Sequence, residues 1–207
     1  MQRYKTHPAR YCHKLPPNVS YAEGALLEPL SVVLHAIRST RLSLGRGALI
    51  CGAGPIGLIA LAAARASGAH PLVITDLEPG RLAFAKTFVP AATTYLVNTD
   101  LDARGNADKI RALFDVDRVG EYAAPETVLE CTGVESSVVT GAYVVRRGGS
   151  LMVIGVGREM LHNLPFMHLS DAEVCIYLPP SFFYFFVLPL SQSLLTQIVV
   201  KDSGQVQ

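Results

Sequence analysis

Short apolar runs alternate with helix-like segments through the middle of the chain. Runs such as Ala48–Cys51 and Leu72–Thr75 are almost continuously apolar, which is typical of parallel strands that are covered on both faces. The segments between them carry the capping residues, glycines and prolines that start and stop helices. We predict strands at residues 48–51, 72–75, 94–97, 127–131 and 151–154, and helices at residues 21–40, 56–66, 78–88, 107–114 and 136–145. This alternation predicts an α/β fold with a doubly wound parallel sheet of the Rossmann type.

The first predicted helix has the clearest start signal. Ser20 and Glu23 have the spacing of a capping box, in which each side chain accepts a hydrogen bond from the other residue's backbone N–H. Pro29 lies inside the apolar run that follows. Because proline lacks the N–H that a continuous helix needs, we expect a kink there.

The last part of the chain departs from this pattern. Residues 175–200 contain no Asp, Glu, Lys or Arg, and the charged fraction of the whole chain is only 17%. The uncharged segment 181–200 has about the length of a membrane span, but Pro189 and several polar residues interrupt it. We therefore treat residues 175–207 as an atypical hydrophobic tail, and we regard a membrane anchor as the less favoured interpretation.

Composition and the amino terminus exclude several classes of protein. The formal net charge is +1, from 18 Lys and Arg against 17 Asp and Glu, so no basic surplus is available for binding nucleic acid. The four cysteines form no C-x-x-C pair, which argues against a zinc ribbon or a disulfide framework. The first residues contain no apolar core of a secretory signal, and we expect a cytoplasmic location.

The sharpest motif is Gly52-Ala-Gly54-Pro-Ile-Gly57, which directly follows a predicted strand and opens a predicted helix. In such a turn the first glycine permits tight bending, the second lets the backbone approach a pyrophosphate, and the third allows close helix–strand packing. The amino end of the helix offers N–H groups and a partial positive charge to phosphates. The motif predicts a dinucleotide-binding site.

A second part of this site lies at the end of the next strand. Asp76 stands where an acidic side chain accepts hydrogen bonds from the adenosine ribose and repels a 2′-phosphate; its alternative role is to cap the following helix. Arg81 either stacks on the adenine or lies on a solvated helix face. An arginine here also suggests NADP, but the carboxylate at the strand end favours NAD.

Five segments, taken together, carry a family resemblance. They are residues 23–32, 50–58, 73–77, 129–135 and 153–157. In this order they resemble the zinc-dependent medium-chain dehydrogenases, in particular the polyol branch of sorbitol, xylitol and fungal L-arabinitol dehydrogenases. The segments Tyr4–Pro8 and Cys12–Pro16 are most similar to the L-arabinitol 4-dehydrogenases, and the resemblance extends from about Arg3 to Val174.

The resemblance implies roles for individual positions. Pro55 and Ile56 match the pyrophosphate turn, and Asp76 and Arg81 match the ribose and adenine contacts. The positions that line the cofactor cleft or face the nicotinamide are Cys131, Thr132, Gly133, Ile154, Gly155 and Val156. Glu28 matches a glutamate beside the catalytic zinc, as a ligand or through its water and substrate. A glutamate among leucines is costly to bury without a partner, and the alternative is a helix carboxylate that points to solvent.

The family reaction implied is NAD-dependent oxidation of a secondary alcohol of a small polyol, with zinc as Lewis acid and hydride transfer to the nicotinamide. Family members form dimers or tetramers, and their amino-terminal catalytic domain supplies a cysteine ligand and a His-Glu pair. None of the six histidines here precedes a glutamate. We therefore expect that zinc is not bound tightly and that the chain by itself is inactive. Because the late strands through which family members associate are replaced here, we do not extend the family's oligomeric state to this chain.

These expectations divide the chain into three parts. Residues 1–45 are a remnant of the catalytic domain with its connecting helix, residues 46–174 form the NAD-binding domain, and residues 175–207 form the tail. Because the resemblance stops at Val174, we interpret the tail as a retained intron or an altered reading frame. The alternatives are a non-catalytic NAD-binding module or interaction fragment and, less favoured, a tail-anchored Rossmann protein.

Overall fold

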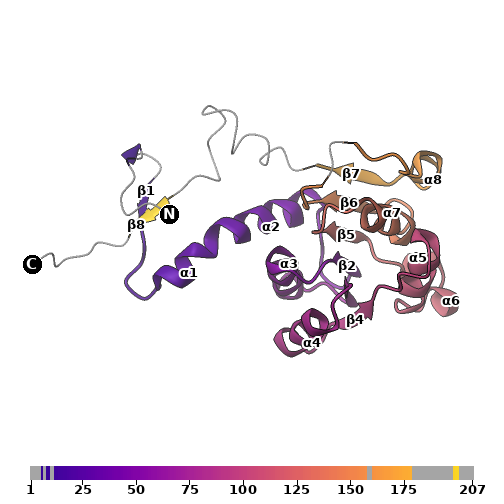
Figure 1. The fold of residues 1–207 in the computed structure, drawn as a ribbon, viewed down its shortest axis with the longest axis horizontal. Coiled ribbons are helices and arrows are strands. Elements are labelled where there is room, and N and C mark those ends of the chain that lie inside the picture. The colour runs from indigo at the N-terminus through magenta and orange to yellow at the C-terminus, as the bar shows by residue number, and fades with distance from the viewer. Residues whose placement is uncertain (1–5, 7, 10–11, 158–159, 179–197, 201–207) are drawn as a thin grey trace, which may run out of the picture. The chain divides into compact units, whose positions relative to one another are not determined.

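The computed structural model describes residues 6, 8–9, 12–157, 160–178 and 198–200 (Figure 1). The chain divides into two compact units. One comprises residues 1–32 and 180–207, and the other comprises residues 33–179. The segment proposed as a membrane anchor lies almost entirely outside the described residues. Within the described ranges, no helix combines the length and the apolar character that crossing a bilayer requires.

The first unit contains a short parallel strand pair and the start of the helical segment. β1 (Cys12–Lys14) pairs with β8 (Ile198–Val200). The predicted capping box opens α1 (Tyr21–Ala25), and the Ser20 N–H donates to the Glu23 carboxylate at 2.7 Å. The helix breaks at Leu26, before α2 (Leu27–Ser39), rather than at Pro29. The proline ring clashes with the carbonyl four residues earlier, and that carbonyl belongs to Ala25, where α1 ends.

The second unit is built on a parallel sheet of six strands in the order β4-β3-β2-β5-β6-β7. Every neighbouring pair is parallel, and Ala48 of β2 lies beside Leu72 of β3 and Thr127 of β5. The strands are β2 (Ala48–Cys51), β3 (Leu72–Asp76), β4 (Thr93–Leu96), β5 (Thr127–Glu130), β6 (Ser150–Val153) and β7 (Cys175–Tyr177). The predicted Rossmann-type fold is confirmed.

Helices cover both faces of this sheet. Figure 1 shows α3 and α4 on one face and α5 and α7 on the other, as right-handed crossovers on either side of the first strand require. The helical elements are α3 (Pro55–Ala66), α4 (Pro79–Phe88), α5 (Ala103–Ala112), α6 (Val116–Val119), the 3₁₀ turn η2 (Glu121–Ala123), α7 (Glu135–Val144) and α8 (Phe166–Asp171).

Several elements differ from the sequence-based prediction. α5 begins at Ala103 rather than Ala107, because the Asp102 carboxylate caps it by accepting the Gly105 N–H at 2.7 Å. β7 lies beyond the boundary drawn at Val174 and pairs with β6, so the sheet extends into the segment assigned to the tail. α6, η2 and α8 were not predicted.

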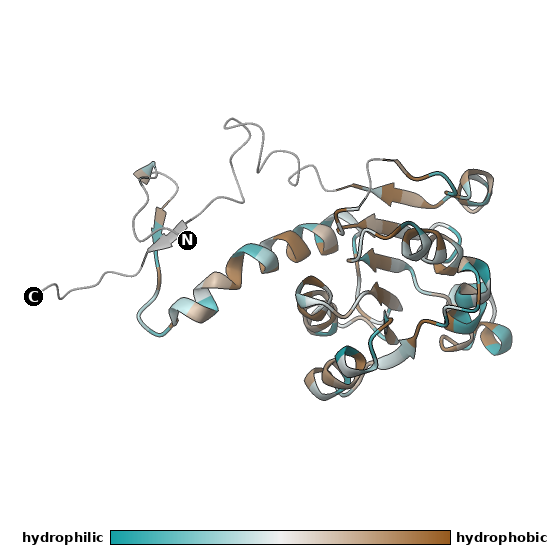
Figure 2. Cartoon of the chain, in the orientation of Figure 1, coloured by the Kyte–Doolittle hydropathy of each residue, from teal (hydrophilic) through white to brown (hydrophobic). Residues whose placement is uncertain are grey.

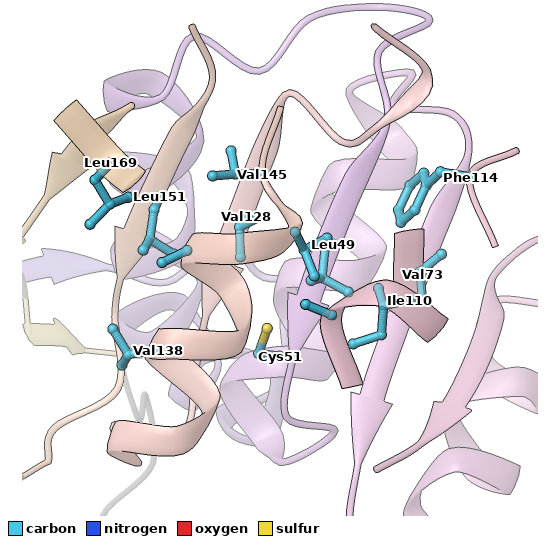
Figure 3. Packing of buried hydrophobic residues seen from close by; sticks show 13 residues of the cluster. Leu49, Cys51, Val73, Ile110, Phe114, Val128, Val138, Val145, Leu151 and Leu169 are labelled. Carbon is cyan, nitrogen blue, oxygen red and sulfur yellow. The ribbon is translucent and has the colours of Figure 1, made fainter. Parts of the chain in front are cut away.

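A large cluster of the core lies between the sheet and the helices α5 and α7 (Figure 3). Leu49, Val128 and Leu151, from three adjacent strands, are fully buried against Ile110 of α5 and Val138 of α7. Burying each such side chain stabilises the fold by about 1.5–3 kcal/mol. Figure 2 shows that the strands in the centre of the sheet are apolar. This core fixes the ends of β2 and β5, from which the predicted site residues emerge.

Candidate cofactor-binding site

The predicted site residues gather where the strand order reverses. The chain runs from β2 outward to β3 and β4, and it then returns to the other side of β2 to form β5. Open α/β sheets bind ligands outside the carboxyl ends of the strands at such a point. The glycine turn 52–57 follows β2 here, and the turn 131–134 follows β5.

The three glycines of the first turn differ in whether the fold requires them. Gly52 has a φ of +96°, which a residue with a side chain rarely adopts, and a Cβ on Gly57 would lie 1.8 Å from the Gly52 carbonyl oxygen. A Cβ on Gly54, by contrast, would have no neighbouring atom within 4 Å. The fold therefore requires Gly52 and Gly57, whereas Gly54 leaves open space at the amino end of α3. Pro55 and Ile56 form the first turn of that helix.

Asp76 connects the glycine turn to the end of β3. Its side chain is 7% exposed, and its two carboxylate oxygens accept the Ala53 N–H at 2.7 Å and the Glu78 N–H at 2.9 Å. The N-cap of α4 is Glu78 rather than Asp76, so the alternative capping role does not describe its geometry. A carboxylate has about four lone-pair sites, and lone pairs remain here for the hydroxyls of a ribose.

Arg81 lies beside this carboxylate on the solvent side. Its Nη1 atom is 3.8 Å from the Asp76 Oδ2 atom, and its side chain is 60% exposed. This distance is longer than a hydrogen bond, and an ion pair whose cation lies mostly in solvent contributes little to stability. The guanidinium is therefore free to reorient toward a nucleotide without a large cost in stability.

The turn after β5 is in direct backbone contact with the segment after β6. A Cβ on Gly155 would lie 2.0 Å from the Gly133 nitrogen, and a Cβ on Gly157 would lie 1.8 Å from the Gly133 oxygen. Gly133 itself has a φ of +71°. The structure thus brings Thr132 and Gly133 together with the segment 154–157, in which Ile154 is buried and Val156 is exposed.

Sequence reasoning missed Glu130, the last residue of β5. Its side chain is fully buried, and its carboxylate accepts hydrogen bonds from the Thr132 and Gly133 N–H groups, each at 2.9 Å. The hydroxyls of Thr132 and Ser137 donate to it as well. No cation pairs with it among the residues that the structure describes. An acidic residue at the end of a buried strand, as at Asp76, was the signal available in the sequence.

Two cysteines flank this carboxylate. Burial raises the pKa of the Cys51 and Cys131 thiols well above the ordinary value, and the negative charge of Glu130 raises both further. Only the thiolate acts as a nucleophile or a metal ligand. At neutral pH these side chains are therefore neutral packing groups in the wall of the site.

Glu28, the predicted neighbour of a catalytic zinc, lies in the first turn of α2 and is exposed. The argument that it is costly to bury therefore does not apply, and its catalytic and metal roles stay predictions. In the described part of the chain, no three His, Cys, Asp or Glu side chains lie together as a metal site. These residues do not fit a catalytic zinc, and we derive no step through it.

A comparison with protein families identifies the wider group. The family model described as zinc-binding dehydrogenase matches residues 55–181. The chain belongs to the zinc-binding dehydrogenase family. The predicted family membership is confirmed.

Curated members of the zinc-binding dehydrogenase family are similar over most of this chain. L-arabinitol 4-dehydrogenase of Aspergillus oryzae is 50% identical over 179 residues, and sorbitol dehydrogenase of Bos taurus is 42% identical over 174 residues. Each match covers 84% of this chain and 46% of the relative, so the chain spans about half the length of these relatives. The solved structure of galactitol-1-phosphate dehydrogenase from Escherichia coli matches with a TM-score of 0.66 and 25% identity, over 79% of this chain and 45% of that chain.

Proposed function

We propose that the chain binds NAD at the carboxyl edge of its sheet and acts as the cofactor-binding part of a polyol dehydrogenase. The observation that carries this proposal is the placement of Asp76, whose buried carboxylate is fixed by the Ala53 and Glu78 N–H groups beside the open position at Gly54. The names of the similar relatives support a small polyol as substrate, with L-arabinitol, sorbitol and xylitol as the first candidates. The enzyme would oxidise a secondary alcohol.

The chain's own residues would bind and orient the cofactor. Asp76 would accept the ribose hydroxyls, and the amino end of α3 next to Gly54 would bind the pyrophosphate. Thr132 and Gly133, with the segment Ile154–Val156, would form the surface against which the nicotinamide lies. Bound NAD supplies the hydride acceptor. A cytoplasmic location belongs to the same proposal, as does a place for Glu28 beside a zinc whose other ligands the described residues do not supply.

The cofactor choice is tested by titrating the purified chain with NAD and with NADP in a calorimeter. We expect NAD to bind at least about tenfold more tightly, because a 2′-phosphate would approach the Asp76 carboxylate. The variant Asp76→Ser should bind NAD more weakly and should show a smaller difference in affinity between NAD and NADP. Asp102→Ser is a matched control, since serine caps α5 as well as aspartate does. Equal affinity for NADP in the unaltered chain would contradict the assignment.

A turnover assay tests the expectation that the chain is inactive by itself. The purified chain is assayed with L-arabinitol, sorbitol and xylitol, NAD and added zinc. We expect NAD binding without turnover, because tight binding of catalytic zinc takes three protein ligands and the described residues do not fit such a site. Measurable NADH formation would refute the expectation that this chain is inactive by itself.

A further inference from the structure

The feature that the proposed function leaves unexplained is a buried carboxylate that pairs with no cation among the described residues. Glu130 is 0% exposed, and a buried carboxylate costs several kcal/mol unless donors satisfy its lone pairs. Its Oε1 atom accepts the Thr132 N–H and the Ser137 hydroxyl, each at 2.9 Å, and also the Thr132 hydroxyl. Its Oε2 atom accepts the Gly133 N–H at 2.9 Å.

These donors belong almost entirely to one turn. Thr132 and Gly133 follow Glu130 directly, and the Thr132 hydroxyl accepts in turn the Val134 N–H at 3.0 Å. The carboxylate therefore fixes the middle of the turn formed by residues 131–134. Ser137, from the first turn of α7, attaches the same carboxylate to the helix that follows.

This turn touches both halves of the proposed cofactor site. The Thr132 methyl group lies 2.7 Å from the position that a Cβ on Gly52 would occupy. On the other side, Gly133 is in backbone contact with Gly155 and Gly157. A displacement of the turn would therefore move the pyrophosphate turn and the segment after β6 relative to each other.

We propose that Glu130 is a positioning residue that sets the spacing between the pyrophosphate turn and the nicotinamide-facing segment. The inference rests on the proposed NAD site. An amide cannot replace this carboxylate, because both oxygens accept backbone N–H groups and one end of a glutamine would present its own N–H₂ to such a donor. The ribose contact is independent of Glu130, since Asp76 is fixed by the Ala53 and Glu78 N–H groups.

The experiment compares two probes, NAD⁺ and AMP, by calorimetric titration of the full chain. AMP reaches the Asp76 end of the site, whereas NAD⁺ extends past the turn that Glu130 holds. In Glu130→Gln we expect the dissociation constant for NAD⁺ to rise about tenfold and that for AMP to change by less than about twofold. A general loss of stability would weaken both probes together.

Glu126→Gln is the matched control. Glu126 lies just before the amino end of the same strand, its side chain is 21% exposed, and it pairs with Arg146 and with Arg46. We expect this variant to bind both probes as the unaltered chain does, even if its stability falls. Ser137→Ala removes one donor and keeps the carboxylate, and it should weaken NAD⁺ about threefold without affecting AMP.

Each outcome decides the proposal. Unchanged NAD⁺ affinity in Glu130→Gln, or a parallel loss of NAD⁺ and AMP, would overturn the positioning role while the NAD site stands. If Glu130→Gln does not fold, unchanged NAD⁺ affinity in Ser137→Ala overturns it. An unaltered chain that binds neither probe would instead overturn the proposed function, and this inference with it.

Discussion

At the scale of single residues, the glycines at positions 54 and 57 serve different ends within one turn. Gly57 packs so closely on the Gly52 carbonyl that the fold itself excludes a side chain, whereas Gly54 faces open space with a backbone conformation that any residue adopts. A glycine that the protein's own packing does not require suggests a constraint from a ligand. We therefore expect Gly57 to be needed for folding and Gly54 for binding.

The variants Gly54→Ala and Gly57→Ala test this separation. We expect Gly54→Ala to change the unfolding free energy by less than about 1 kcal/mol, because alanine restricts the unfolded chain but is a poorer N-cap of α3 than glycine. Its affinity for NAD should fall at least about tenfold. Gly57→Ala should lose at least about 2 kcal/mol of unfolding free energy through overpacking. Urea unfolding and calorimetry measure the two effects. Unchanged NAD affinity in Gly54→Ala would count against a phosphate at this position.

At the scale of elements, one buried side chain organises the connection from β4 to α5. Asn106 accepts the Tyr95 hydroxyl at 2.8 Å and the Asn98 N–H at 3.0 Å, and its amide donates to the carbonyls of Asn98, Leu101 and Asp102. All its hydrogen-bonding groups are satisfied, although it is 3% exposed. Such a network costs more to break than its number of hydrogen bonds suggests, because the partners are left unpaired.

Asn106→Leu should therefore destabilise the fold by about 2–4 kcal/mol in urea unfolding. Tyr95→Phe is the graded control, because it removes one donor and leaves the Asn98 N–H on the same oxygen. We expect it to cost about 1 kcal/mol. If the two variants lost equal stability, the asparagine would not be the centre of the network.

At the scale of the whole molecule, the apolar pattern predicted the strands of the sheet well, whereas the turns and helix starts between them were predicted poorly. The strands β2 and β3 were predicted to within one residue, because strands buried on both faces form continuous apolar runs. The start of α5 was missed because Asp102 was not recognised as its cap. Glu130 was missed although its place at the end of a buried strand was a signal, because its contact with Ser137 depends on how the turn and α7 fold back onto the strand.

The stability of the second unit should fall at alkaline pH. The pKa of Cys51 and Cys131 is raised in the folded state, so above the ordinary value of 9.0 the unfolded chain releases these protons first and unfolding is favoured. For each thiol, the unfolding free energy falls by up to about 1.4 kcal/mol per pH unit. Urea unfolding at pH 8 and at pH 10 measures the fall in unfolding free energy between the two pH values. This fall should be smaller in Cys51→Ala than in the unaltered chain, and in the exposed Cys175→Ala it should equal that of the unaltered chain.

The pairing of β2 with β5 has a consequence for biosynthesis. Ala48 lies beside Thr127 in the sheet, so the two walls of the proposed site come from opposite halves of the polypeptide. A nascent chain that has emerged only through β4 contains the glycine turn and Asp76 but lacks the Glu130 turn and the segment after β6. Contacts this distant in sequence form late and slowly. A ribosome-bound chain should therefore acquire affinity for the whole dinucleotide only after residue 157 has left the exit tunnel.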